Sequence, residues 1–200
     1  MEIINDYTTK VDELKNTGYQ VNIEDYLRKG LWIFRQKPEL FLIYTALNLV
    51  VWPVGGFFFA GPLTAGFFIV AHRITRGRSV IIDYYFDGFK RFIPLFLVVP
   101  VSAILISIGF VFFIIPGIFL AVAYTFAIFF IIFGKVDFWE AMELSRKMVS
   151  AEWFKIFILT LVLGLLNFLG ALAFGVGLLF SIPISFCALY AAFDDIIGAN

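Results

Sequence analysis

Residues 92–134 have the sequence FIPLFLVVPVSAILISIGFVFFIIPGIFLAVAYTFAIFFIIFG, which contains no charged side chain. A helix needs about 20 apolar residues to cross a hydrocarbon core of roughly 30 Å. The stretch is therefore too long for one crossing and predicts two helices joined by a tight turn. Ile115-Pro116-Gly117 lies near its middle, and because Gly and Pro interrupt helices we expect the turn there.

Two further stretches, residues 40–71 and 156–193, also lack Asp, Glu, Lys and Arg. Each has Gly or Pro near its middle, at Trp52-Pro53-Val54-Gly55-Gly56 and Gly61-Pro62 in the first, and at Gly170, Gly175 and Gly177 in the second. The first stretch is short for two crossings, so its helices are expected to borrow flanking residues or to include a broken one. The sequence thus predicts an all-α membrane protein with six transmembrane helices in three hairpins.

Composition supports the bilayer as the solvent. Hydrophobic residues make up 62% of the chain and charged residues 15%, and there are 27 Phe. A soluble domain is typically about a quarter charged, and one of this size could not bury so much apolar surface. The formal net charge is zero, so we expect no nucleic-acid partner.

The basic residues lie outside the three uncharged stretches. Six precede the first stretch, five separate the first from the second, and four separate the second from the third, which accounts for all 15. Because Lys and Arg concentrate in cytoplasmic loops, both termini and both long connections are expected to be cytoplasmic.

The segments before each stretch resemble one another. Ile23, Asp25, Tyr26, Gly30 and Phe34 recur as Ile81, Asp83, Tyr84, Gly88 and Phe92, and less faithfully as Phe138, Glu140, Met142, Ser145 and Val149. Such self-similarity predicts repeated units, here about residues 23–77, 81–134 and 138–196, related by a pseudo-threefold axis. They form a single membrane domain, residues 22–200, behind a polar N-terminal tail, residues 1–21, expected to be mobile.

Each unit is predicted to begin with a cytoplasmic amphipathic helix. The expected apolar stripes are Ile23, Leu27, Leu31 and Phe34, and Ile81, Tyr85, Phe89 and Phe92, at helical spacing. The small residue at the shared position, Gly30, Gly88 or Ser145, indicates either close helix approach or a local break.

The segments IEDYLRKGLWIFRQKPELFL (23–42), GPLTAGFFIVAHRITRG (61–77) and FWEAMELSRKMVSAEWFK (138–155) resemble a bacterial family. It comprises the membrane domain of glycerophosphodiester phosphodiesterases and its free-standing relatives. The likeness covers about residues 22–195 and implies a multi-pass protein of the bacterial cytoplasmic (inner) membrane. The family's soluble catalytic domain has no counterpart here, so its activity is not carried over.

No motif predicts catalysis, a cofactor or a metal site. The single histidine, His72, is expected at the interface, and Cys187 as a small packing residue. The uncharged stretches contain neutral polar residues, expected to form interhelical hydrogen bonds rather than a translocation path: Thr45, Asn48, Thr64, Ser102, Ser107, Tyr124, Thr125, Thr160, Asn167, Ser181, Ser185 and Tyr190.

One surface feature suggests a ligand. Arg73, Arg76, Arg78, Lys90 and Arg91 lie just outside the crossings, where basic groups attract anionic lipid head groups by about 1 kcal/mol each; alternatively they only set orientation. The leading hypothesis is a non-enzymatic membrane subunit or scaffold that interacts with lipid or a partner protein. The alternatives are a transporter or channel for an uncharged or lipidic solute and, last, a membrane-embedded enzyme.

Overall fold

The structure, a computed structural model, describes residues 2–173 and 175–198. This part of the chain forms helices and turns and no strand, which confirms the all-α prediction. The elements are α1 (Glu2–Thr17), α2 (Ile23–Gln36), α3 (Pro38–Thr75), the 3₁₀ helix η1 (Ile82–Arg91), α4 (Phe92–Phe112), α5 (Ile114–Ala123), α6 (Ala127–Phe133), α7 (Phe138–Ala151), α8 (Trp153–Leu172) and α9 (Leu178–Ile196).

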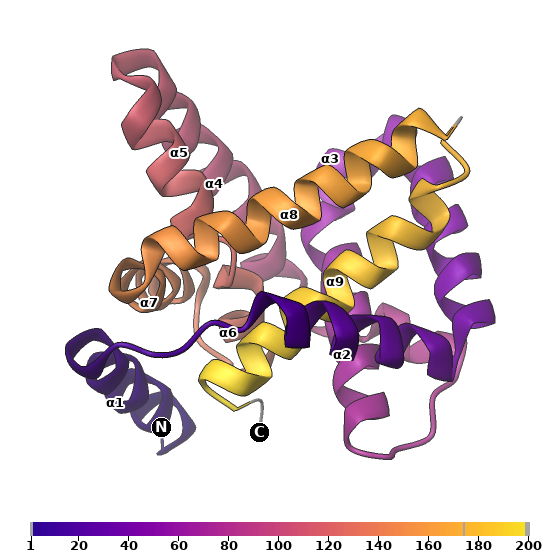
Figure 1. Cartoon of the computed structure of the whole chain (residues 1–200), viewed down its shortest axis with the longest axis horizontal. Helices are drawn as coiled ribbons and strands as arrows, with labels where there is room; N and C mark the ends of the chain where they lie inside the picture. Colours follow the sequence, from indigo (N-terminus) through magenta and orange to yellow (C-terminus); the bar gives the residue numbers. More distant parts are fainter. Residues whose placement is uncertain (1, 174, 199–200) are drawn as a thin grey trace.

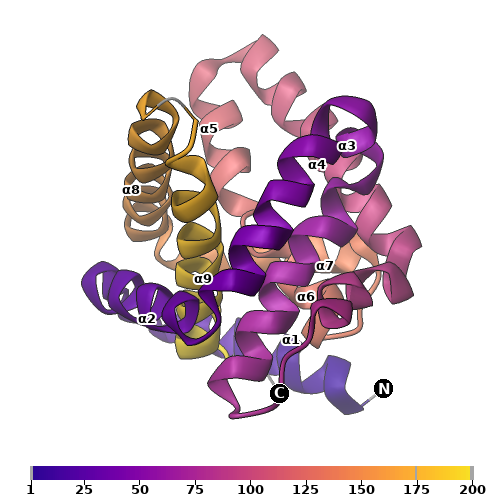
Figure 2. The ribbon, with the colours of Figure 1, turned by 90° about the vertical axis from the view of Figure 1, so that its right-hand side faces the viewer.

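The start of α1 and the end of α9 lie at one end of the molecule (Figure 1). The bend of α3 and the turns that join α4 to α5 and α8 to α9 lie at the opposite end (Figure 2). The α4–α5 pair diverges from α8 toward the upper left in Figure 1. Gly55 is the non-helical residue within α3, and Gly175 and Gly177 lie between α8 and α9, as predicted. The α4–α5 break is at Phe113, so the predicted turn Ile115-Pro116-Gly117 lies instead in the first turn of α5. Gly61-Pro62 and Gly170 lie inside helices.

Helix α3 folds back on itself. Its backbone leaves helical geometry at Gly55, with φ −163° and ψ 15°. Tyr44 Oη in the first half donates a hydrogen bond to Leu63 O in the second (2.9 Å), and the Tyr44 and Phe67 rings lie 4.9 Å apart. The two halves therefore lie side by side in opposite directions.

Five helical segments of the described chain are long and apolar enough to cross a membrane: Phe58–Thr75, Ile82–Phe112, Ile114–Phe133, Trp153–Leu172 and Leu178–Ile196. The sequence predicted six. The first half of α3, Pro38–Pro53, is a shorter apolar helix, about 24 Å long at 1.5 Å per residue. It is short because the first uncharged stretch has only 32 residues and the bend at Gly55 divides it near its middle.

The N-terminal segment, predicted to be a polar and mobile tail, contains helix α1, which packs on the rest of the protein. Tyr7, Val11 and Leu14 share one face of α1, and the first two are buried. Tyr7 meets the Phe130 ring edge-on at 6.0 Å, and Asp12 pairs with Lys147 of α7 at 3.6 Å. The stripe is short, so packing against the rest of the protein stabilises this helix more than its own sequence does.

Asn22 is the N-cap of helix α2, and its side chain accepts a hydrogen bond from Asp25 N (3.3 Å). Its buried residues are Tyr26, Gly30, Ile33 and Phe34. Of the predicted stripe only Phe34 is buried, whereas Ile23, Leu27 and Leu31 are half-buried. The buried face is therefore rotated toward Tyr26 and Gly30, which both contact α9.

The second predicted surface helix, residues 81–92, is a 3₁₀ helix. Because a 3₁₀ helix has three residues per turn, its inner face consists of every third residue: Ile82, Tyr85, Gly88 and Arg91. Ile81 and Phe92, expected in the α-helical stripe, are instead 50% and 37% exposed.

The segment between α4 and α7 is broken at Tyr124–Phe126, between α5 and α6. Ser145 of α7 lies against this break: its Oγ accepts a hydrogen bond from Phe126 N (3.1 Å) and donates one to Ala123 O (2.6 Å). Ser145 is fully buried. Since unpaired backbone groups are costly in an apolar interior, Ser145 stabilises the interruption.

Gly30 and Gly88, which the sequence comparison aligned, both allow close approach, as one of the two interpretations predicted. A Cβ on Gly30 would lie 2.7 Å from Ala188 N, and one on Gly88 would clash with Pro62 O and lie 2.9 Å from Ala65 Cβ. Neither position has room for a larger side chain.

Candidate functional site

The five basic residues predicted to meet lipid head groups lie at the end of α3 and the end of η1. Arg73 stacks on Tyr84, with its guanidinium carbon 3.5 Å from the ring centroid, and its Nε donates to Ser79 O (3.1 Å). Arg76 forms an ion pair with Asp194 of α9 (3.3 Å). These two arginines therefore join the end of α3 to η1 and to α9.

The other three basic residues differ in their surroundings. Lys90 pairs with Asp87 one turn earlier (2.7 Å), and Arg91 donates to Ile131 O (3.2 Å) and Val136 O (3.5 Å) at the end of α6. Arg78 is exposed and forms no ion pair with any residue that the structure describes. Of the five, Arg78 is the most available to an external anion.

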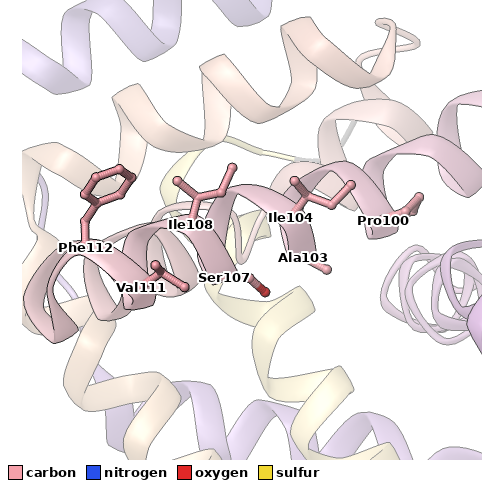
Figure 3. A pocket seen from close by; sticks show the side chains of 7 residues that line it. All are labelled: Pro100, Ala103, Ile104, Ser107, Ile108, Val111 and Phe112. Carbon is pink, nitrogen blue, oxygen red and sulfur yellow. The ribbon is translucent and has the colours of Figure 1, made fainter.

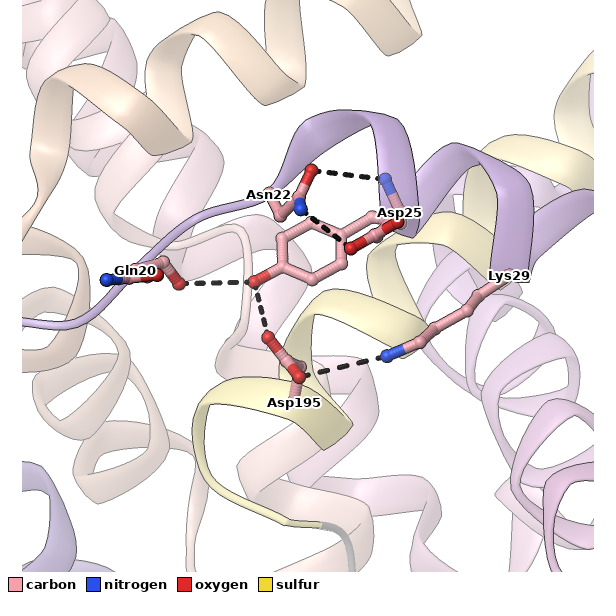
Figure 4. Close-up of polar contacts among 6 residues, drawn as sticks. Gln20, Asn22, Asp25, Lys29 and Asp195 are labelled. Atoms are coloured by element: carbon pink, nitrogen blue, oxygen red, sulfur yellow. Dashed lines mark hydrogen bonds and ion pairs between the residues drawn. The ribbon is translucent and has the colours of Figure 1, made fainter.

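A polar network joins α2 to the end of α9 (Figure 4). Tyr26 Oη donates to Asp195 Oδ2 (2.8 Å), and Lys29 Nζ lies 3.8 Å from Asp195 Oδ1. Burial, together with the hydrogen bond to the Asp195 carboxylate, raises the pKa of Tyr26 well above its usual range. The phenol therefore stays protonated and keeps donating to Asp195.

Asp194 and Asp195 line a pocket of about 290 Å³ at this end of the molecule. Its lining comes from α2, α3 and α9: Lys29, Trp32, Ile33, Thr75, Tyr190, Ala191, Asp194 and Asp195. Neither acid had a role predicted from the sequence. The available signal was their position, an adjacent acidic pair directly after the third uncharged stretch.

His72 and Cys187 have structural surroundings. His72 lies near the end of α3, as expected of an interfacial residue, with Nδ1 3.1 Å from Tyr190 Oη. Cys187 is fully buried on α9, as predicted for a small packing residue. Among the described residues no three His, Cys, Asp or Glu side chains gather closely enough to hold a metal ion.

A shallow apolar groove of about 380 Å³ runs along α4 (Figure 3). All of its lining residues come from this one helix: Pro100, Ala103, Ile104, Ser107, Ile108, Val111 and Phe112. Val111 and Phe112 are 84% and 72% exposed. Such a face suits contact with lipid chains.

Two pockets of mixed polarity lie on either side of Phe186 and Ile182 of α9. The α8–α9 pocket, about 310 Å³, contains Thr125, Thr160, Asn167 and Ser185. The α3–α9 pocket, about 280 Å³, contains Thr45, Asn48 and Thr64. Seven of the twelve neutral polar residues singled out in the sequence thus gather around these two cavities.

Few of these polar residues form the predicted interhelical hydrogen bonds. Asn167 Nδ2 donates to Ser185 Oγ (3.1 Å) between α8 and α9, and Tyr190 contacts His72. The hydroxyls of Thr45, Ser102 and Thr160 and the amide of Asn48 bond instead to carbonyls of their own helices. Their remaining acceptor capacity is available to a ligand.

Comparison of the chain with protein-family models, curated proteins and solved structures found no match. The resemblance to phosphodiesterase membrane domains therefore stays a prediction.

Proposed function

We propose that the chain is a multi-pass membrane protein with six crossings, cytoplasmic termini and no chemistry of its own, which serves as a membrane subunit or scaffold. The observation that carries this proposal is the location of charge. Within Ile114–Phe133 there is no charged residue, and in the last two candidate spans charges lie only at the ends, at Lys155 and at Asp194–Asp195.

Exposed apolar side chains support the same conclusion. Val50, Val111 and Ile115 are 72%, 84% and 79% exposed. Soluble monomers rarely leave extended apolar surface uncovered, whereas a bilayer solvates it.

Packing between the three units supports the threefold repeat. The first helix of each unit packs on the last helix of another: α2 on α9, η1 on the second half of α3, and α7 on α5–α6. The contacts are made by the small residues at the shared position, Gly30 against Ala188, Gly88 against Ala65 and Ser145 against Ala123. This closed cycle is what three units around one axis would produce.

The resemblance described above adds the bacterial inner membrane as the location. In this setting Arg78, supported by Arg73, Arg76, Lys90 and Arg91, would contact anionic head groups on the cytoplasmic side, and a protein partner would dock on the same charged end. Phosphatidylglycerol retained by the purified chain, counted by native mass spectrometry, tests this directly.

Arg78→Gln should reduce the retained phosphatidylglycerol about fivefold, since one basic residue contributes about 1 kcal/mol. The matched control is Arg28→Gln, because Arg28 is also exposed but pairs with Glu24 (2.7 Å) outside the cluster. A reporter after Gly77 checks orientation. Equal retention in correctly oriented Arg78→Gln would leave the cluster as a topology signal.

A second candidate function is a transporter or channel for an uncharged or lipidic solute. The two polar-lined pockets beside Phe186 favour it. Flux of such a solute across the membrane of liposomes that contain the purified chain would favour this function over that of a subunit or scaffold.

A further inference from the structure

We propose that the α8–α9 pocket binds an uncharged lipid alcohol from within the membrane. The proposal rests on the membrane-spanning part of the proposed function and is independent of head-group binding by Arg78. The volume of the α8–α9 pocket, about 310 Å³, lies at the lower end of the range for small-molecule sites.

The depth of the pocket decides the class of ligand. At 1.5 Å per residue, Asn167 lies about 21 Å along α8 from Trp153, and Ser185 lies about 15 Å along α9 from Asp195. Both are therefore well inside the apolar layer. The lining contains no charged residue, and ions are costly at this depth, so the ligand is apolar and uncharged.

The hydrogen bonds of Asn167 indicate the functional group. Its Nδ2 donates to Leu163 O (3.0 Å) and to Ser185 Oγ (3.1 Å). A carbonyl can only accept a hydrogen bond, so the amide nitrogen of Asn167 must face Leu163 O and its amide oxygen must face away from that carbonyl. That Oδ1 is buried and has no partner among the described residues, so it needs a donor.

A hydroxyl group fits this requirement better than an ether or a ketone. It donates to Asn167 Oδ1 and, at the same time, accepts from the hydroxyl of Ser185 or Thr125, which line the same pocket. An ether or a ketone can only accept and would leave Oδ1 without a partner. The pocket should therefore bind an alcohol in preference to an ether or a ketone.

Gly164 provides the space. It lines the pocket, and a Cβ at this position would meet nothing within 4 Å. Phe186 also lines the pocket and stacks on Phe67, with ring centroids 4.9 Å apart. Because a Cβ at position 164 meets no neighbour and Leu favours helix over Gly, a leucine at this position should narrow the site without weakening α8.

The test uses the full chain in phosphatidylcholine nanodiscs and a twelve-carbon alcohol that carries a photoreactive diazirine. Its methyl ether is the matched probe without a donor. Cross-linked peptides are mapped by mass spectrometry. We expect the alcohol to label α8 and α9 at least fivefold more than the ether does, and Asn167→Leu to remove that preference.

Gly164→Leu should reduce labelling by the alcohol at least tenfold. Ala171→Leu makes the same kind of change at an exposed position of α8 outside the pocket, and should leave labelling within twofold. Thermal unfolding of each variant verifies folding. Equal labelling by alcohol and ether, or undiminished labelling of folded Gly164→Leu, would overturn the proposal; topology reporters test the membrane crossings separately.

Discussion

Gly30 of α2 lies directly against Ala188 of α9, so that a Cβ on Gly30 would come within 2.7 Å of the Ala188 backbone nitrogen and 2.9 Å of its Cβ. Real Cβ atoms essentially never come that close to backbone atoms. Together with the hydrogen bond between Tyr26 and Asp195, this contact fixes α2 across the end of α9.

Gly30→Leu should therefore destabilise the protein by about 1–3 kcal/mol, the usual cost of overpacking. Gly164→Leu is the matched control, because it makes the same change on a helix where a Cβ meets nothing within 4 Å. Thermal unfolding in detergent measures both. Equal melting temperatures for the two variants would show that α2 does not pack on α9 as described.

Ser145→Ala should cost about 1–3 kcal/mol, because it leaves Phe126 N–H and Ala123 C=O buried without partners. The control is Ser150→Ala on the same helix. Ser150 is exposed and bonds to Arg146 O of its own helix (2.6 Å), so its loss should be nearly neutral. Unfolding curves that do not separate the two variants would contradict the role assigned to Ser145.

Tyr26 and Asp195 should be energetically coupled. A double-mutant cycle of Tyr26→Phe and Asp195→Ala should give a coupling of about 1.5–3 kcal/mol, as for hydrogen bonds to charged groups. The cycle of Lys29→Met with Asp195→Ala is the comparison. Lys29 and Asp195 are 3.8 Å apart and both side chains are about half exposed, so their coupling energy should stay below about 1 kcal/mol. A larger coupling energy for Lys29–Asp195 than for Tyr26–Asp195 would refute the network.

Glu143 should make stability depend on pH. Two hydrogen bonds from Arg146, 2.9 and 2.7 Å long, hold the pKa of Glu143 below its ordinary value. In the unfolded chain the pKa of a glutamate is about 4.3. Because the pKa of Glu143 is lower in the folded protein, its ionised carboxylate stabilises the fold at pH values above about 4.3, and this stabilisation is lost as the pH falls through the pKa of the folded state.

The free energy of unfolding of Glu143→Gln should then fall below that of the unmodified chain at pH 7 and match it near pH 3. The difference should be about 0.2–0.5 kcal/mol, because both side chains are partly exposed. Glu140→Gln, at an exposed position of the same helix, controls for loss of charge alone. A difference that persists at pH 3 would exclude this linkage.

The approximate turn positions were predictable because Gly and Pro lie near the middle of long uncharged stretches, although the α4–α5 break is at Phe113 and Pro116-Gly117 lies just inside α5. The helical class followed from the length of those stretches. The helix at the N-terminus was not, because Tyr7 and Val11 are buried by α7 and α6 rather than by a strong local pattern. The form of η1 was also missed, since apolar residues at positions 81, 85, 89 and 92 satisfy an α-helical spacing that tertiary packing overrides.

Less of the candidate sites could be predicted. Arg73, Arg76, Lys90 and Arg91 contact the protein itself through partners distant in sequence or one turn away, which composition does not reveal. The gathering of Asn167, Ser185 and Thr125 around one pocket depends on the break between α5 and α6. That break depends in turn on Ser145, 19 residues beyond Phe126.

The six crossings depend on the short helix Pro38–Pro53, which is shorter than the other five apolar segments. If this helix crosses, both termini are cytoplasmic; if it does not, five crossings place the termini on opposite sides, with the six basic residues before the first stretch outside. The most direct test attaches paired green fluorescent protein and alkaline phosphatase reporters to each terminus and to an insertion at Gly55. Six crossings with cytoplasmic termini should give fluorescence without phosphatase activity at both termini and phosphatase activity at Gly55. Phosphatase activity at either terminus would contradict this topology.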